Sequence, residues 1–153
     1  MSKYVASSIG PGLNTTAATA QNVIIYNSTV APIGPARVYE FSVGPAGNSA
    51  DNTYVIRAIR TSTTGTFTNA ITPSPLDTKI GASLTLFKNT SSAAATAATE
   101  LGRWGFHMRG GYRWVAIPGG ELQVSTGVNV GITWDTTFAQ GSDVMNWNVF
   151  FDE

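Results

Sequence analysis

Apolar and polar residues alternate with a period of two along much of this chain, most clearly toward its C-terminus. One such run places apolar side chains at every second position, namely Val128, Val130, Ile132 and Trp134. The same alternation extends from Met145 to Phe151. A period of two puts the apolar side chains on one face of a β-strand. An apolar strand left at an exposed edge would invite aggregation, so we expect these segments to pair within a sheet.

Nine or ten segments share this character, being β-branched or alternating and bounded by turn-forming residues. They are residues 23–26, 37–43, 53–61, 66–72, 82–87, 101–108, 112–117, 121–125, 127–135 and 144–152. The Ala-rich residues 91–99 are interpreted as a loop with one helical turn at most, because no apolar stripe accompanies the alanines. Strands this closely spaced, without long helices between them, predict an antiparallel β-sandwich or jelly-roll-like barrel.

The chain is predicted to form one domain, residues 21–153, preceded by an extended N-terminal arm, residues 1–20. Gly10, Pro11 and Gly12 interrupt regular structure in the arm, and the Thr/Ala tract that follows lacks core periodicity. Within 37–43, one face is predicted to hold Tyr39, Phe41 and Val43 and to turn toward the core. The opposite face is predicted to hold Val38, Glu40 and Ser42. The predicted core comprises Tyr39, Phe41, Val43, Ile56, Leu84, Leu86, Val128, Val130, Ile132, Trp147 and Val149.

Composition narrows the classes of function. Charged residues make up 12% of the chain, about half of the usual ~25%. The formal net charge is zero, which argues against a general binder of nucleic-acid phosphates, since that role needs surplus Lys and Arg. With no cysteine, disulfides and thiolate metal sites are excluded. The N-terminus has no apolar signal-peptide core, and no apolar run approaches ~20 residues, so we expect folding in a cytoplasm and no membrane span.

The chain has few residues that could form a catalytic site. His107 is the single histidine, so it has no partner of its kind for a metal, and no local Gly-x-Ser-x-Gly signature indicates a nucleophile. A structural or surface role for His107 is therefore the expectation. The carboxylates are scattered, and a glycosidase-type pair depends on a spatial separation that spacing along the chain cannot show. The chain is predicted to be no enzyme and to hold no cofactor or metal, with a hydrolase kept as an alternative.

Residues 103–114 interleave Arg with Trp, Phe, His and Tyr. This mixture is consistent with base stacking on single-stranded nucleic acid, with a protein interface or with ordinary strand alternation. The neutral charge weakens the nucleic-acid interpretation, and the other two remain open. Alternation would direct Tyr112, Trp114 and Ala116 to one face, and Arg113, Val115 and Ile117 to the other.

Three segments resemble a pattern found in small virion proteins of tailed bacteriophages: a PLD segment, an RWVA-P-G-EL segment and a terminal acidic pair. The matching residues are Pro75, Leu76, Asp77, Arg113, Trp114, Val115, Ala116, Pro118, Gly119, Glu121, Leu122, Asp152 and Glu153. The resemblance covers about a third of the chain, and the first half has no counterpart in it. Some such proteins resemble capsid decoration, or cement, proteins, which sit as trimers on the outer shell.

The resemblance implies a structural virion protein on the capsid surface, with the major capsid protein and other copies of itself as partners. It also implies a homotrimer. The alternative is a tail-fibre or carbohydrate-binding module that recognises a host surface through exposed Trp and Tyr. The expected partner contacts are apolar residues of the arm and two arginines of the hairpin region, namely Tyr4, Val5, Ile9, Leu13, Arg109 and Arg113.

Overall fold

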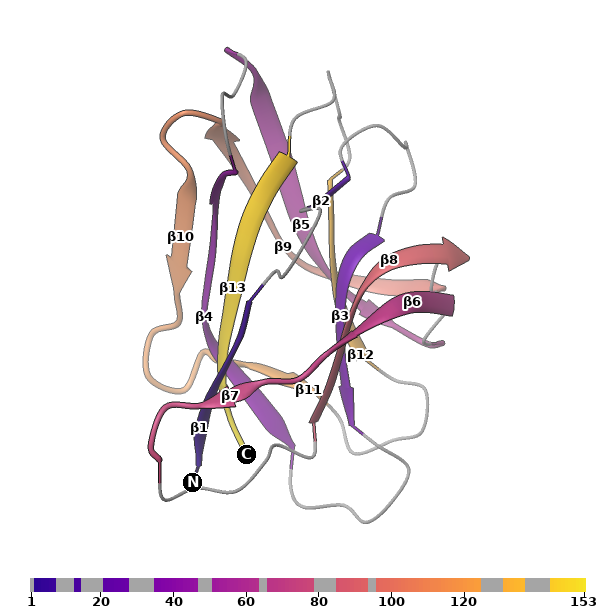
Figure 1. The fold of residues 1–153 in the computed structure, drawn as a ribbon, viewed down its shortest axis with the longest axis vertical. Helices are drawn as coiled ribbons and strands as arrows, with labels where there is room; N and C mark the ends of the chain where they lie inside the picture. Colours follow the sequence, from indigo (N-terminus) through magenta and orange to yellow (C-terminus); the bar gives the residue numbers. More distant parts are fainter. Residues whose placement is uncertain are drawn as a thin grey trace.

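The computed structural model shows an all-β protein in which two antiparallel sheets pack into a sandwich (Figure 1). It describes residues 2–7, 13–14, 21–27, 35–46, 51–63, 66–78, 85–93, 96–124, 131–136 and 144–153. These residues form strands, turns and bends, and none of them is helical. The predicted fold class is confirmed. The alternation of apolar and polar residues correctly predicted strands that bury one face.

The first sheet has seven strands in the order β10-β4-β13-β1-β7, with β11 also pairing with β4 and β2 with β13. Its strands are β1 (Lys3–Ser7), β2 (Leu13–Asn14), β4 (Ala36–Pro45), β7 (Ser74–Pro75), β10 (Tyr112–Val115), β11 (Leu122–Val124) and β13 (Val144–Asp152). Short β7 forms one edge of this sheet, where its proline does not interrupt the ladder. The opposite edge is β10.

The second sheet has six strands in the order β6-β8-β3-β12-β5-β9. They are β3 (Gln21–Asn27), β5 (Thr53–Thr61), β6 (Thr66–Ile71), β8 (Thr85–Ala93), β9 (Ala97–His107) and β12 (Gly131–Thr136). The expectation of a loop over 91–99 is wrong at both ends, since β8 continues to Ala93 and β9 begins at Ala97. Pairing with β6 and β5 supplies the backbone hydrogen bonds there, and tertiary pairing overrides the helix propensity of alanine.

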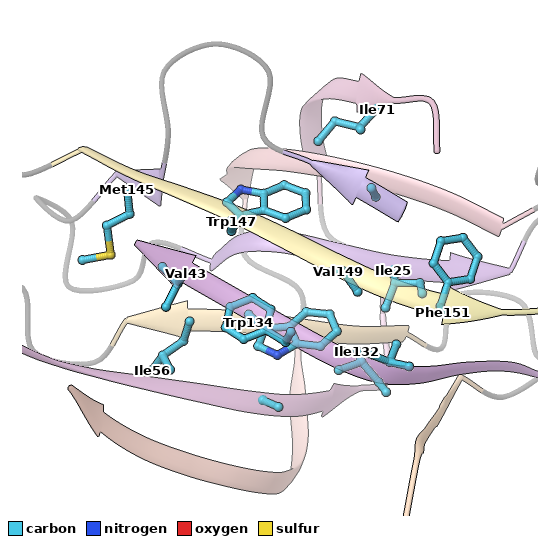
Figure 2. Close-up of a cluster of buried hydrophobic side chains, with 14 of the residues drawn as sticks. Ile25, Val43, Ile56, Ile71, Ile132, Trp134, Met145, Trp147, Val149 and Phe151 are labelled. Carbon is cyan, nitrogen blue, oxygen red and sulfur yellow. The ribbon is translucent and has the colours of Figure 1, made fainter. Parts of the chain in front are cut away.

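The core lies between the sheets and draws large side chains from both (Figure 2). Phe41 of β4 stacks on Trp134 of β12, with ring centroids 5.4 Å apart and planes 9° apart, so the two layers meet directly at this point. Six residues of the predicted core are confirmed as buried: Phe41, Val43, Ile56, Ile132, Trp147 and Val149. Leu84, Val128 and Val130 lie outside the described residues, as does the side chain of Leu86.

Tyr39 was expected in the core, and this is wrong. The pairing of β13 with β4 shifts register so that Phe150 lies opposite Glu40 while Phe151 lies opposite Val38. Tyr39 is the extra residue of this β-bulge, and a bulge reverses which positions face inward. Val38, predicted to face outward, is therefore buried, and Tyr39 is only half-buried.

Lys3–Ser7 is extended, as predicted, but it is not an arm outside the domain. It forms β1, which pairs with β13 from Lys3 opposite Asp152 to Ser7 opposite Asn148. Tyr4 and Ala6 point into the core, where the Tyr4 ring stacks on Phe151 at 5.4 Å. Two apolar residues at alternate positions suffice for a strand once a neighbouring strand is available to pair with. Residues 8–12 and 15–20 of the predicted arm lie outside the described residues.

Candidate interaction surface

Strand alternation divides the aromatic and basic residues of the 103–114 segment between two faces. Tyr112 and Trp114 are half-buried and face inward, whereas Arg113 and Val115 are exposed. Trp104 of β9 lies 6.1 Å from the Tyr112 ring and 5.9 Å from the Trp114 ring. These rings close the side of the sandwich where the edge strands β9 and β10 meet. Packing between the sheets accounts for the inward-facing aromatic residues of the segment. Its outward-facing residues are available for contacts.

A tight turn over residues 108–111 carries the chain from one sheet to the other. The backbone N–H groups of Gly110 and Gly111 donate to the His107 carbonyl, and Gly111 has a φ of 63°. A Cβ at Gly111 would lie 2.7 Å from the Val43 carbonyl oxygen, so only glycine allows this close approach to β4. The turn thereby sets the position of β10 at the sheet edge.

His107 takes part in a polar contact beside this turn. Its Nδ1 accepts a hydrogen bond from the backbone N–H of Arg109, and its Nε2 lies 2.7 Å from Oδ1 of Asp51. In the neutral ring this arrangement places the proton on Nε2, which donates to the carboxylate. The Arg109 Nε lies 3.9 Å from the same oxygen. These contacts connect the segment before β5 to the end of β9.

β10 and β11 follow one another along β4, and the segment that contains them presents exposed apolar side chains at this edge of the seven-stranded sheet. Val115 is 51% exposed and Ile117 is 76% exposed. Beside them, Nε and Nη2 of Arg113 donate to the two carboxylate oxygens of Glu40 at 2.7 and 2.9 Å. This bidentate pair ties the outward side of β10 to β4.

The turn between β10 and β11 is internally hydrogen-bonded. The Gly120 N–H donates to the Ile117 carbonyl at 2.8 Å, and the Gly119 N–H donates to Oε1 of Glu121 at 3.2 Å. Hydrogen bonds from its own backbone N–H and from that of Gly119 lower the pKa of the Glu121 carboxyl. Before the turn, the Ala116 N–H donates to the Tyr39 carbonyl. Ile117 is therefore held out toward solvent by an ordered backbone.

The same outward face continues across the sheet to the other edge. In its centre the rings of Tyr39 and Phe150 lie 6.4 Å apart, and Nζ of Lys3 lies 5.6 Å from the centre of the Tyr39 ring. Val5 lies directly opposite Phe150 on the neighbouring strand. At the far edge, Leu76 is 51% exposed and its N–H donates to the Lys3 carbonyl. We call this surface, from β10 to Leu76, the outward face.

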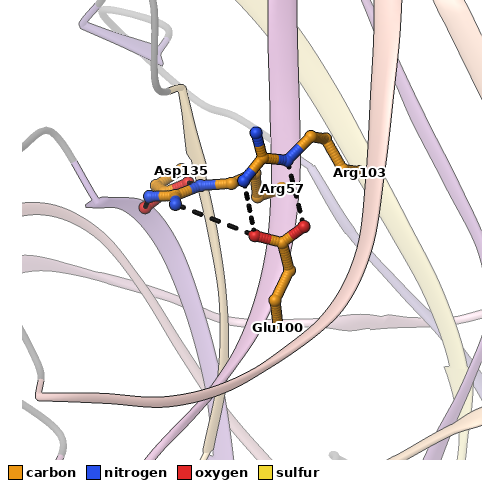
Figure 3. A network of polar contacts seen from close by, with 4 residues as sticks. All are labelled: Arg57, Glu100, Arg103 and Asp135. Atoms are coloured by element: carbon orange, nitrogen blue, oxygen red, sulfur yellow. Dashed lines mark hydrogen bonds and ion pairs between the residues drawn. The ribbon is translucent and has the colours of Figure 1, made fainter.

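The six-stranded sheet carries a charged network on its own outer side (Figure 3). Arg57 donates through Nε and Nη2 to both oxygens of Asp135, at 2.9 and 2.7 Å. Glu100 lies between Arg57 and Arg103, 3.8 Å from the former and 2.8 Å from the latter. The hydrogen bond from Arg103 lowers the pKa of Glu100. Each charge in this network has an opposite partner, and the network links β5, β9 and β12.

The structure places the six predicted contact residues in different environments. Tyr4 is 3% exposed, so its prediction as a partner anchor is wrong: the ring serves the protein's own core. Val5 is half-buried on the outward face, and Arg109 and Arg113 are exposed. Ile9 lies outside the described residues, as does the side chain of Leu13 in β2.

Sequence reasoning missed the exposed apolar residues of this surface. Alternation around Trp114 correctly predicts that Val115 shares a face with Arg113, but it does not show that this face is open to solvent. Ile117 lies beyond β10 and is exposed. The position of Leu76 on the same face depends on the pairing of β7 with β1, for which the chain carries no local signal.

Within the described residues, no group of three or more His, Asp or Glu side chains could hold a metal ion. That part of the chain also contains no helix with the length and apolar character of a membrane span. Comparison with known protein families, curated proteins and solved structures finds no match to this chain.

Proposed function

We propose that this protein is a structural virion protein that decorates the outside of a phage head and stabilises contacts between major capsid proteins. The observation that carries the proposal is the location of the residues in the phage-like segments. Pro75 to Asp77 lie in and after β7, the RWVA-P-G-EL residues run from β10 through the following turn into β11, and the acidic pair lies at the end of β13. All three segments belong to the seven-stranded sheet.

The chemistry of the outward face supports a protein partner. Its centre combines the half-buried Tyr39, Phe150 and Val5 with Lys3, and its charges are of both signs. Aromatic side chains with a few charges at the rim are typical of protein interfaces, whereas a nucleic-acid surface would be strongly basic.

A glycan-binding module is the alternative, and the four Trp residues weigh against it. Trp134 and Trp147 are fully buried, while Trp104 and Trp114 are half-buried against other rings. Sugar platforms require an aromatic face open to solvent, and on the outward face only the half-buried rings of Tyr39 and Phe150 among the described residues could serve that role.

Co-sedimentation with capsids that lack this protein tests the proposal. Wild-type protein should sediment with the capsids at micromolar concentration. Val5→Glu, which places a charge in the centre of the outward face, should lower the bound fraction at least tenfold. Val55→Glu is the matched control, because Val55 is also a half-buried valine but lies on the outer side of the six-stranded sheet.

Circular dichroism and thermal unfolding should first show that both variants fold. If wild-type protein stays in the supernatant, or if both variants lose binding equally, the proposal fails. Binding of wild-type protein to a glycan array without capsid binding would favour the alternative.

A further inference from the structure

The outermost strand of the six-stranded sheet, β9, is the longest described strand and has a neighbour on one side only. It spans 11 residues and pairs with β5, and no described strand pairs with its other side. An open edge of this kind recruits further strands unless something blocks it. The two edges of the seven-stranded sheet are shorter, since β7 has 2 residues, one of them a proline, and β10 has 4. The β9 edge therefore offers a longer row of backbone groups than either.

Hydrogen bonding to β5 shows which backbone groups of β9 lie on its free side. In an antiparallel pair, successive residues direct their N–H and C=O groups alternately toward the partner strand and away from it. Met108 donates its N–H to the Asn52 carbonyl. Because the register continues without a shift through the second half of β9, the N–H and C=O groups of Arg103, Gly105 and His107 point away from β5. The His107 carbonyl fits this pattern, since it accepts hydrogen bonds from the turn that follows β9.

We propose that the free side of β9, over residues 102–107, binds an extended segment of a partner protein as an added strand. The N–H groups of Arg103, Gly105 and His107 and the first two of their carbonyls are available to it. Backbone hydrogen bonds of this kind give affinity in strand addition, and alternate side chains give specificity. The site belongs to the six-stranded sheet, so it is separate from the outward face to which the capsid proposal refers.

Gly105 leaves the middle of this edge without a side chain. A Cβ there would meet nothing closer than 4.0 Å, so the packing of this chain does not require glycine at the position. Gly102 differs, because a Cβ there would lie 2.5 Å from the Trp104 ring. Glycine inside a strand often marks a place where another backbone approaches closely. A glycine that the fold itself does not need thus lies at the centre of the row of outward backbone groups.

The residues beside the edge indicate which side chains the partner segment carries. On the inner side, the rings of Trp104, Tyr112 and Trp114 are half-buried and lie against one another. On the outer side, Arg103 and His107 are exposed, and each already lies beside a carboxylate. A strand directs alternate side chains to its two sides. The segment therefore carries apolar side chains at every second position, which cover the rings, and neutral polar side chains between them.

Two bulges in β9 favour a flexible segment over a second copy of the protein. Leu101 and Ala98 are extra residues in the pairing with β5. Bulges twist a strand edge and hinder flat pairing between two edges. A second copy would bring a β9 with the same two bulges, held in its own sandwich, whereas a flexible segment adapts to the regular stretch beyond them.

The probe is a short synthetic peptide in which Val and Thr alternate, with one Lys at each end for solubility. It is titrated to millimolar concentration into isotope-labelled protein, and the exchange of backbone amides with water is measured by NMR. We expect the N–H groups of Arg103, Gly105 and His107 to exchange at least threefold more slowly with the peptide present, because each becomes hydrogen-bonded. The Trp104 N–H points toward β5 and is the internal control, whose exchange should not change.

Gly105→Pro removes the central donor on the free side and leaves the hydrogen bonds to β5 in place. We expect it to weaken peptide binding about tenfold, because one hydrogen bond is lost and the proline ring obstructs the edge. Gly105→Ala is the matched control, since it keeps the N–H and should bind like wild type. A peptide of the same composition with its valines grouped together should bind as weakly to wild type as the alternating peptide binds to Gly105→Pro.

Circular dichroism first establishes that both variants fold. Equal binding of the peptide to wild type and to both folded variants would overturn the inference, as would no binding to wild type at millimolar concentration. A wild-type dimer that Gly105→Pro dissociates would also overturn it, because the occupant would then be a second copy. The amide exchange measurement uses wild-type protein, so it decides the matter even if Gly105→Pro does not fold. None of these outcomes depends on whether the protein binds capsids.

Discussion

At the scale of single residues, Gly111 and Gly119 allow the energetic cost of a strained backbone to be compared with the cost of a steric clash. Gly111 and Gly119 both have positive φ, 63° and 82°, where an alanine costs about 1–2 kcal/mol. A Cβ at Gly119 would meet nothing within 4 Å, whereas at Gly111 it would meet the Val43 carbonyl. We expect Gly119→Ala to lose only the strain energy and Gly111→Ala to lose about 1–3 kcal/mol more. Urea unfolding measures the stability of both variants. Equal losses of stability would show that the close approach of Gly111 to β4 does not exclude a Cβ.

The buried phenol of Tyr4 makes stability sensitive to alkaline pH. Burial raises the pKa of Tyr4 above 10.0, and the nearby negative charge of Glu153 adds to the rise. The folded state therefore holds the phenol proton more tightly than the unfolded state. The resulting stabilisation is complete below pH 10 and is lost as the pH rises through the raised folded pKa.

We expect Tyr4→Phe to abolish this contribution, so its free energy of unfolding should fall less steeply above about pH 10 than that of wild type. The difference in slope can reach about 1.4 kcal/mol per pH unit. Tyr39 and Tyr112, whose pKa values are also raised by burial, contribute equally to both proteins. Parallel stability curves measured by denaturant unfolding at several alkaline pH values would contradict this account.

At the scale of elements, β1 is a strand of the seven-stranded sheet, although the sequence alone predicts an extended arm there. Removing residues 2–7 deletes the Tyr4 and Ala6 side chains from the core and exposes β13 on one side. Losing a buried aromatic alone costs about 3–5 kcal/mol, which is a large share of the stability of a typical domain. We expect the truncated protein to lose cooperative unfolding in circular dichroism and calorimetry.

Lys3→Ala serves as the control for that truncation, because Lys3 is an exposed residue of the same strand and its change should shift stability by about 0.5 kcal/mol or less. A truncated protein with a wild-type transition would mean that β1 is dispensable and can act as an arm.

At the scale of the whole molecule, the two ends of the chain lie together. Ser2 and Glu153 exchange two backbone hydrogen bonds, N–H to carbonyl, of 3.0 and 3.1 Å. A short Gly-Ser linker can therefore join them without distorting β1 or β13. We expect a circular permutant that is joined there and opened between Ser62 and Thr63, in an exposed bend, to fold with a cooperative transition.

A second permutant, opened between Phe41 and Ser42 in the middle of β4, is the comparison. It interrupts a strand that pairs with β10, β11 and β13, so it should fail to fold. If both permutants fold equally well, continuity of β4 is not needed for the sandwich. If neither folds, the linker cannot join Ser2 and Glu153 without distorting β1 or β13.

Much of the fold could be predicted from the period of two, because a strand with one buried face must alternate. That is why 53–61 and 144–152 match β5 and β13, and why the opposite directions of Trp114 and Arg113 were predicted correctly. Alternation and local propensity fail as guides where pairing with another strand changes which side chains face inward or which residues form a strand. A bulge at Tyr39 reverses the alternation, and alanines at 97 and 98 join a strand because β5 lies beside them.

The sequence by itself determined the class of fold, the inward and outward sides of β10 and β13 and the lack of thiol chemistry, since these depend on neighbouring residues and composition. Only the tertiary structure decided that Tyr4 belongs to the core, because its ring partner Phe151 comes from a distant part of the chain. It also decided that Leu76 and Val115 lie at opposite edges of one sheet. Strand order arises from long-range pairing that brings residues 3 and 152 together, and no local pattern encodes which strands become neighbours.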